Sequence, residues 1–185
     1  TVAAIAAASA YFMRPAPVDA PQMRLQIVTP PGGLTDFAIS PDGRNVVYQA
    51  SVDGRSQLWL RALEQADAQP LAGTENAGAP FWSPDSQWVG FSQGAQLRRI
   101  AIGGGTPLTV VESRSAVRGG TWSLADVIVF APANTAPLFR VPSTGGTLVE
   151  ATRLDSPRQV AHRFPHFLPD GRHFLFFATG APSVE

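Results

Sequence analysis

Short segments of alternating apolar and polar residues recur along the chain, each beginning within or directly after a turn signal. The clearest are NVVYQ, QWVGFS, DVIVF and RHFLFF, which begin at residues 45, 87, 126 and 172. Alternation with a period of two, together with enrichment in Val, Ile, Phe and Tyr, is typical of half-buried β-strands. Gly and Pro, with 17 residues each, interrupt the chain too often for long helices. The pattern predicts an all-β fold built from short strands.

Aligning the chain with itself reveals an internal repeat with a period near 43 residues. Four copies begin at residues 38, 81, 121 and 166, with the sequences AISPDGRNVVYQ, FWSPDSQWVGFS, TWSLADVIVFAP and HFLPDGRHFLFF. Their shared turn position falls at Pro41, Pro84, Leu124 and Pro169, which gives spacings of 43, 40 and 45 residues. A repeat of this length must be a unit of structure larger than a single hairpin.

The Ser-Pro-Asp-Gly motif, complete in the first copy and varied in the others, predicts the tip of a β-hairpin in each. Proline presets φ, aspartate accepts hydrogen bonds from nearby backbone N–H groups, and glycine supplies a positive φ at the turn exit. The second copy has Ser86 in place of glycine, and the third reads SLAD, a turn one residue shorter in which the aspartate is displaced. Because the four aspartates belong to different copies, we interpret them as turn residues and not as an acid cluster. The structural turn residues expected on this basis are Pro41, Asp42, Gly43, Pro84, Asp85, Asp126, Pro169, Asp170 and Gly171.

A second pattern downstream of each hairpin predicts two more strands per copy. The segments QLWLRAL, QLRRIAI and PLFRVPS begin at residues 57, 96 and 137, and each is followed by a turn and another leucine. Four short antiparallel strands in roughly 43 residues are the signature of a β-propeller blade. The four tryptophans are expected mainly to pack between strands of these blades: Trp59, Trp82, Trp88 and Trp122.

The number of copies predicts an incomplete ring over residues 23–185. Three copies are complete and the fourth ends after its first hairpin, which makes about three and a half blades, whereas closed propellers have about four to eight. We therefore expect an open ring with exposed strand edges, which favour pairing with other chains. Residues 23–28 are predicted to form a strand that would close the full ring against its last blade.

The start of the chain has a different character. Residues 1–13 are uncharged and mostly apolar, but a helix of this length reaches only about 20 Å across a hydrocarbon core about 30 Å thick. We interpret them as the C-terminal part of a transmembrane helix that begins upstream. A secretory signal segment ending near Ala8, Ser9 and Ala10 and an Ala-rich soluble helix remain alternatives. Residues 14–22 contain three prolines and favour an extended linker.

Charge and composition exclude several kinds of chemistry within these 185 residues. The 14 basic and 14 acidic residues balance, so electrostatic attraction to nucleic acid is not expected. All basic residues are arginine, and both lysine and cysteine are absent. Phosphate-loop and kinase-type lysines, Schiff-base nucleophiles, disulfides and thiolate catalysis are therefore excluded.

The remaining candidate motifs favour structural roles. His162 and His166 have the spacing of a helical zinc pair, with His173 nearby, but Pro165 stands between them and the HExxH glutamate is missing. Gly103 to Gly105 lack a following GK[ST], and no GxSxG elbow occurs. We therefore expect no catalytic residue, metal or cofactor in this segment.

Five arginines are candidates for a partner or ligand surface. Propeller loops converge on the faces of the ring, and arginine is enriched at interfaces. Ordinary solvated arginines are the alternative interpretation. The candidates are Arg98, Arg99, Arg118, Arg158 and Arg163.

At these motifs the chain resembles the TolB-type, WD-like propeller repeat, whose aromatic-Ser-Pro-Asp-Gly turn is seen as ISPDGR, FWSPDS and FLPDGR over about residues 34–178. In more detail, FWSPDSQWVGF, LRRIAIGGGTP, GGTWS, VIVFAP, LFRVPSTGGT and HRFPHFLPDGRHFLFFA look like the propeller that follows the membrane helix in bacterial receptor-type serine/threonine protein kinases. That resemblance implies a cytoplasmic kinase domain, one membrane helix and an extracytoplasmic propeller. No kinase motif occurs in these residues, so kinase activity would belong to sequence upstream.

The sequence therefore predicts a non-catalytic propeller segment that senses a ligand or binds a protein. Its expected location is the extracytoplasmic side of a bacterial cell membrane, held by the single N-terminal helix. One alternative is a periplasmic TolB-like scaffold released by signal cleavage. Another is a propeller that accompanies a prolyl-peptidase-like hydrolase domain. The protein or small-molecule partner is left open, and fold analogy alone does not supply it.

Overall fold

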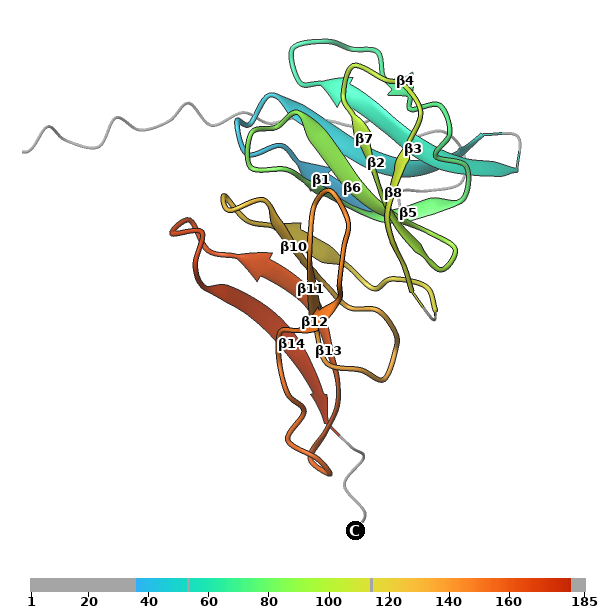
Figure 1. The fold of residues 1–185 in the computed structure, drawn as a ribbon. Coiled ribbons are helices and arrows are strands. Elements are labelled where there is room, and N and C mark those ends of the chain that lie inside the picture. The colour runs from blue at the N-terminus through green and yellow to red at the C-terminus, as the bar shows by residue number, and fades with distance from the viewer. Residues whose placement is uncertain (1–35, 53, 114, 181–185) are drawn as a thin grey trace, which may run out of the picture.

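The computed structural model describes residues 36–52, 54–113 and 115–180. Within these ranges the chain forms only strands, turns and loops (Figure 1), and none of it is a helix long and apolar enough to cross a membrane. The predicted membrane-helix remnant at 1–13, the linker at 14–22 and the closing strand at 23–28 lie outside the described residues. The prediction of an all-β fold is confirmed for the described part.

The strands form three four-stranded antiparallel sheets and one two-stranded hairpin. The first sheet contains β1 (Phe37–Ile39), β2 (Asn45–Val52), β3 (Arg55–Ala62) and β4 (Gln69–Pro70). The second contains β5 (Ala77–Trp82), β6 (Trp88–Gln93), β7 (Gln96–Ala101) and β8 (Leu108–Glu112). The third contains β9 (Gly120–Trp122), β10 (Val127–Phe130), β11 (Phe139–Pro142) and β12 (Val149–Glu150). The hairpin pairs β13 (Gln159–Phe167) with β14 (Phe174–Gly180).

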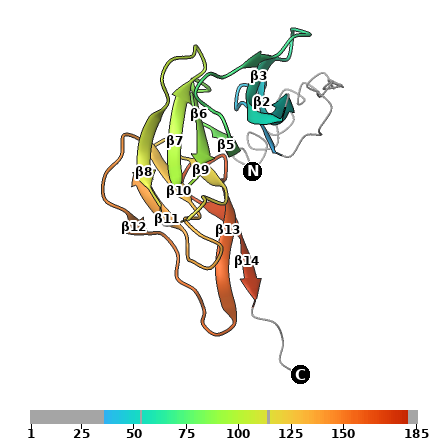
Figure 2. The same cartoon turned by 90° about the vertical axis from the view of Figure 1, so that its right-hand side faces the viewer.

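Each four-stranded sheet is one copy of the sequence repeat, and the sheets follow one another around a common axis. Strands pair in chain order within each sheet. The first strand of every sheet contacts the first strand of the next, in the series β1, β5, β9 and β13. Figure 2 shows the sheets stacked in this sequence, ending in the β13–β14 hairpin. The described residues therefore form a partial propeller of three blades and half of a fourth.

Hydrogen bonds between neighbouring blades join residues about one repeat apart. The indole N–H of Trp82 donates to the carbonyl oxygen of Ala38 at 3.0 Å, a separation of 44 residues. The backbone N–H of Phe167 donates to Oγ1 of Thr121 at 3.1 Å, a separation of 46 residues. The period seen in the sequence is thus the distance along the chain between side-by-side positions on adjacent blades.

The hydrophobic core lies between the sheets. Alternation along β2 sends Val47 towards the second sheet, where it packs in a cluster with Leu58, Val89 and Phe91. A second cluster, which includes Phe130, fills the space between the second and third sheets. The second sheet therefore buries both of its faces, one against each neighbouring sheet.

The β13–β14 hairpin stands at one end of the partial ring. Among the described residues β14 pairs only with β13, so its other edge carries backbone groups without a strand partner. Leu175 and Phe177 on β14 are exposed. This is the exposed edge that the repeat count predicted.

Candidate functional site

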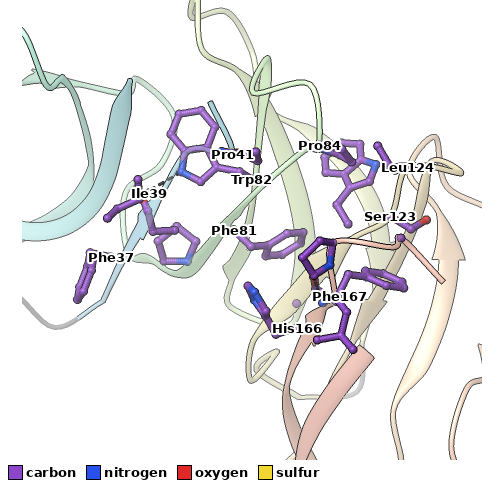
Figure 3. A pocket seen from close by; sticks show the side chains of 18 residues that line it. Phe37, Ile39, Pro41, Phe81, Trp82, Pro84, Ser123, Leu124, His166 and Phe167 are labelled. Carbon is purple, nitrogen blue, oxygen red and sulfur yellow. Dashed lines mark hydrogen bonds between the residues drawn. The ribbon is translucent and has the colours of Figure 1, made fainter. Parts of the chain in front are cut away.

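A hollow of about 720 Å³ opens where the inner strands of the four repeat units converge. Its walls are the ends of β1, β5, β9 and β13 together with the turns that follow them (Figure 3). The lining is mainly apolar and aromatic. Prominent members are Phe37, Ile39, Phe81, Trp82, Leu124 and Phe167.

Several side chains of this central hollow are exposed although they are large and apolar. Leu124 is 74% exposed, Phe37 59% and Ile39 58%. By contrast, Trp82 and Phe81 are buried in the contacts between blades and present only part of their surface. An exposed apolar cluster of this kind, contributed by several blades, is characteristic of a binding surface.

Two irregularities in the inner strands shape the hollow. In β5 the pairing register shifts between Gly78 and Phe81, and Ala79 takes a positive φ of 49°. In β13 the register shifts between Arg163 and His166, and Phe164 has a φ of 51°. Each left-handed residue stands directly before a proline, so these are strained bulges at equivalent places in the second and fourth repeats.

The sequence carried a signal for these bulges that repeat alignment alone did not reveal. The segments APFW and FPHF place a proline just before the inner-strand aromatic residues, 85 residues apart. Proline within a strand indicates a bulge or an edge. In the third repeat the corresponding left-handed position is Gly119, with a φ of 84°.

The three Ser-Pro-Asp or Leu-Pro-Asp turns surround the hollow. Pro41, Pro84 and Pro169 all line it. Gly43 and Gly171 occupy the turn exits with φ of 69° and 66°, the conformation for which glycine has no steric cost.

The aspartates of these turns are bound by their own loops. Oδ1 of Asp42 and of Asp85 accepts a hydrogen bond from the serine hydroxyl two residues earlier and from the backbone N–H two residues later, the latter at 3.0 Å in both turns. Oδ1 of Asp170 accepts from the backbone N–H groups of Arg172 at 2.9 Å and His173 at 3.0 Å. These contacts organise the hairpin tips.

The same hydrogen bonds hold two of the carboxyl groups in the ionised state. The backbone N–H and side chain of His173, with the N–H of Arg172, lower the pKa of Asp170 to about 2. The hydroxyl of Ser40 and then the N–H of Arg44 lower the pKa of Asp42. A general acid at neutral pH needs a raised pKa, so these two side chains have the opposite of the required property.

Asp126 occupies a different place in its turn from the other three aspartates. Its N–H donates to the carbonyl oxygen of Ser123 at 3.1 Å, as the N–H of Ser86 does to Ser83 at 3.0 Å, so Asp126 is equivalent to Ser86. Both residues have a φ of 60°. The Asp126 carboxylate accepts from the indole N–H of Trp122 at 2.8 Å instead of binding the turn backbone. The displacement of this aspartate within its turn therefore gives its carboxylate a tryptophan side chain as hydrogen-bond donor in place of the turn backbone.

The structure does not bring the five candidate arginines together. Arg98 is half-buried on β7, where its guanidinium donates to the side-chain oxygen of Gln93 and to the carbonyl oxygen of Pro107. Arg99 lies next to it in sequence but stacks over the ring of Trp88, with 4.6 Å from the guanidinium carbon to the ring centroid. Both hydrogen bonds of the Arg98 guanidinium are thus to groups of its own blade.

The other three arginines lie elsewhere. Arg118 and Arg163 come from the third and fourth repeats and both bind Asn134, through its side-chain oxygen at 2.9 Å and its carbonyl oxygen at 2.7 Å. Arg158 makes only a 3.8 Å ion pair with Asp155, and both are exposed. Arg163 therefore joins the fourth repeat to the third, Arg118 bonds within the third repeat, and the five do not form one surface.

The three histidines are also separate. His162 is buried at the junction of the third and fourth repeats, where Nδ1 is 2.8 Å from Oγ1 of Thr152 and Nε2 is 2.9 Å from Oε1 of Gln159. His166 lines the central hollow, and His173 lies 2.6 Å from Asp170 through Nδ1. Within the part of the chain that the structure describes, no group of three or more potential ligands is placed to hold a metal ion.

The four tryptophans differ in burial and in the surfaces that they contact. Trp82 and Trp122 are buried, while Trp59 and Trp88 are half-buried. Trp59 packs on the outer face of the first sheet with Tyr48. Both buried rings also form part of the central hollow.

Comparison with known proteins identifies the fold. No protein-family model matches the chain, and no curated protein matches it in sequence. Among solved structures, a putative TolB from Agrobacterium tumefaciens superimposes with a TM-score of 0.71 at 19% identity, over 82% of this chain and 57% of that one. TolB from Acinetobacter baumannii gives a TM-score of 0.68 at 13% identity, over 82% of this chain and 39% of that one.

A third structure is more distant. The β-propeller domain of the Trilobed protease from Pyrococcus furiosus, which has an open velcro topology, gives a TM-score of 0.52 at 15% identity, over 80% of this chain and 55% of that one. The chain thus spans little more than half the length of these proteins, or less. It has a TolB-like β-propeller fold, as predicted. The finer resemblance to kinase-associated propellers stays a prediction.

Proposed function

We propose that this TolB-like segment is a non-catalytic binding module whose central hollow receives apolar side chains of a protein partner. The observation that carries the proposal is the exposure of Leu124, Phe37 and Ile39 on a hollow of about 720 Å³. Apolar and aromatic side chains form the cores of protein interfaces, surrounded by a polar rim. Here the turn aspartates and their bound N–H groups supply such a rim.

A protein partner accounts for the hollow better than a small ligand does. Small-molecule sites combine an enclosed apolar pocket with a few convergent polar groups that orient the ligand. The central hollow instead has a mainly apolar lining drawn from four repeat units, with Thr121, Ser123 and His166 as its polar side chains. A surface of this form suits a protruding loop or strand from another protein.

Photo-crosslinking in the cells that produce the protein tests this proposal. The full-length protein would carry a benzoylphenylalanine in place of Leu124 in the hollow, or in place of Val149 on the outer strand β12 as the control. Both residues are exposed in the structure. We expect a discrete protein adduct from position 124 only, and its loss when Ile39→Asp is added. Equal adducts from both positions, or an adduct that persists in a folded Ile39→Asp protein, would contradict the proposal.

We also propose that the segment is the extracytoplasmic part of a membrane-anchored bacterial serine/threonine kinase. The support is the resemblance of FWSPDSQWVGF, VIVFAP and HRFPHFLPDGRHFLFFA to the propellers of such proteins, together with the apolar residues 1–13. The reading frame on both sides of these residues is the test. A kinase domain and a complete membrane helix upstream are expected. A cleavable signal without a kinase would favour a periplasmic scaffold, and a downstream GxSxG domain would favour a hydrolase.

A further inference from the structure

A second pocket of about 480 Å³ lies between the second and third blades, beside the turns. It adjoins the central hollow, with which it shares Pro84, Trp122, Ser123 and Leu124. Its distinctive lining is polar as well as aromatic: Asp85, Trp88, Arg99 and Asp126 belong to this pocket and not to the hollow. We refer to it as the inter-blade pocket.

The shorter third turn accounts for the opening. Between the first and second blades, the backbone N–H of Asp42 donates to Oγ of Ser86 at 3.2 Å and so joins the two turn tips. Asp126 takes the place of Ser86 in the third turn, but its carboxylate is turned back to the indole N–H of Trp122. Among the described residues, no hydrogen bond joins the tip at Asp85 to the tip at Asp126.

The pocket presents hydrogen-bonding groups that the protein leaves unused. Arg99 has five N–H donors, yet apart from stacking on Trp88 its guanidinium makes one long contact of 3.5 Å, to Oγ of Ser143. Asp85 and Asp126 each use Oδ1 within their own turns. The Oδ2 atoms of both carboxylates accept no hydrogen bond from the described residues.

This combination of groups selects a neutral ligand that has both donors and acceptors. Two carboxylates disfavour an anion, and a cation without acceptor atoms would leave the guanidinium unused. Hydroxyl groups both donate to carboxylates and accept from a guanidinium. The half-buried ring of Trp88 and the apolar Pro84 and Leu124 provide surface for C–H groups.

We propose that the inter-blade pocket binds a neutral sugar. Its volume is within the range of ligand pockets, about 300–1,000 Å³, and suits one or two sugar rings. Arg99 donates to ring or hydroxyl oxygens, and the carboxylates of Asp85 and Asp126 accept from hydroxyl groups. This site does not depend on the protein partner proposed for the central hollow.

Indole N–H signals in NMR spectra of the full-length protein provide the test. The probes are glucose, galactose, N-acetylglucosamine and maltose, with inorganic phosphate and lysine amide as an anion and a cation. We expect saturable shifts of the Trp88 and Trp122 signals with at least one sugar, while the Trp59 and Trp82 signals stay in place. These two act as internal controls because neither lines the pocket.

A matched pair of variants makes the test specific. Arg99 and Arg140 each stand two residues after the equivalent leucines Leu97 and Leu138, but Arg140 is exposed on the third blade outside the pocket. Arg99→Ala is expected to weaken sugar binding about tenfold or more, the range for a hydrogen bond to a charged group. Arg140→Ala should leave binding unchanged. The proposal fails if no sugar gives saturable shifts, if phosphate or lysine amide binds more tightly, or if both variants, shown to be folded, behave alike.

Discussion

The junction between the first and second blades and the junction between the second and third blades use the same repeat positions in different ways. At the first junction, Asp42 donates to Ser86 and the Trp82 indole donates to Ala38, so hydrogen bonds join the two blades at the turn and along the inner strand. At the second, the Trp122 indole is bound by Asp126 of its own blade, and the inter-blade pocket opens beside it.

At the second junction a hydrogen bond from the Ser113 hydroxyl to the carbonyl oxygen of Pro132 at 2.7 Å lies away from the turn tips, and the inner strands are joined by packing. Phe81 inserts between Gly90 of its own blade and Gly120 of the next. A Cβ atom at Gly90 or Gly120 would lie 2.3 or 2.5 Å from the ring, far inside van der Waals contact. The comparison shows that a hydrogen bond joins the turn tips at the first junction, whereas the tips at the second junction, beside the aromatic wedge, border a pocket.

Removal of the wedge is expected to have the largest effect. Phe81 is buried in the cluster between the second and third blades, and Phe81→Ala should lower the free energy of unfolding by about 3–5 kcal/mol, the usual cost of a large cavity. Chemical denaturation of the full-length protein measures the change.

A glycine substitution provides the control for the wedge. Gly120→Ala should cost about 1–3 kcal/mol in the native background because the new methyl group overlaps Phe81. It should cost much less when Phe81→Ala is already present, since the ring is gone. If the two effects simply add, Phe81 does not occupy the space beside Gly120.

Replacement of each inner-strand tryptophan by phenylalanine compares the two junctions directly. Trp82→Phe leaves the carbonyl oxygen of Ala38 without the indole N–H, whereas Trp122→Phe leaves the exposed carboxylate of Asp126, which water can solvate. Both changes lose similar ring area, so the difference compares the cost of leaving each acceptor without its indole N–H. We expect Trp82→Phe to cost about 1 kcal/mol more in denaturation experiments. Equal losses would show that the bond between the first two blades contributes no more than the bond within the third blade.

The junction of the third and fourth repeats adds a smaller, pH-dependent contribution. Oε1 of Gln159 also accepts from the backbone N–H of Asp155, and Oγ1 of Thr152 accepts from the N–H of Leu138. His162 Nε2 therefore donates and Nδ1 accepts, which is the neutral form of the ring. Burial lowers the pKa of His162 from its ordinary value of 6.5.

The sign of the pH effect follows from the lowered pKa. Below pH 6.5 the unfolded chain takes up a proton at this residue before the folded chain does, so stability is complete above that pH and falls as the pH decreases through the folded pKa. Thermal melts should show a lower melting temperature at mildly acidic than at neutral pH. His162→Gln should flatten this slope. A slope unchanged by His162→Gln would assign the effect to other groups.

The sequence by itself determined the architecture and most of the local turns. Period-two alternation and the Pro-Asp-Gly signals depend only on neighbours along the chain, and the spacing near 43 residues is read directly from the sequence. Together they sufficed to predict the four-stranded units and the half-blade at the end. The inner-strand bulges at Ala79 and Phe164 also have a local sequence signal, the proline that follows each of them.

Only the tertiary structure decided how the blades meet. Arg98 and Arg99 are adjacent in sequence, yet one is bound within its own blade and the other stacks on Trp88 at the inter-blade pocket. Asp126 looks like a displaced turn residue until its contact with Trp122 is seen. The inter-blade pocket brings together segments some 40 residues apart, residues 83–99 and 122–126, and their distance is set by how one blade packs against the next, which no local pattern encodes.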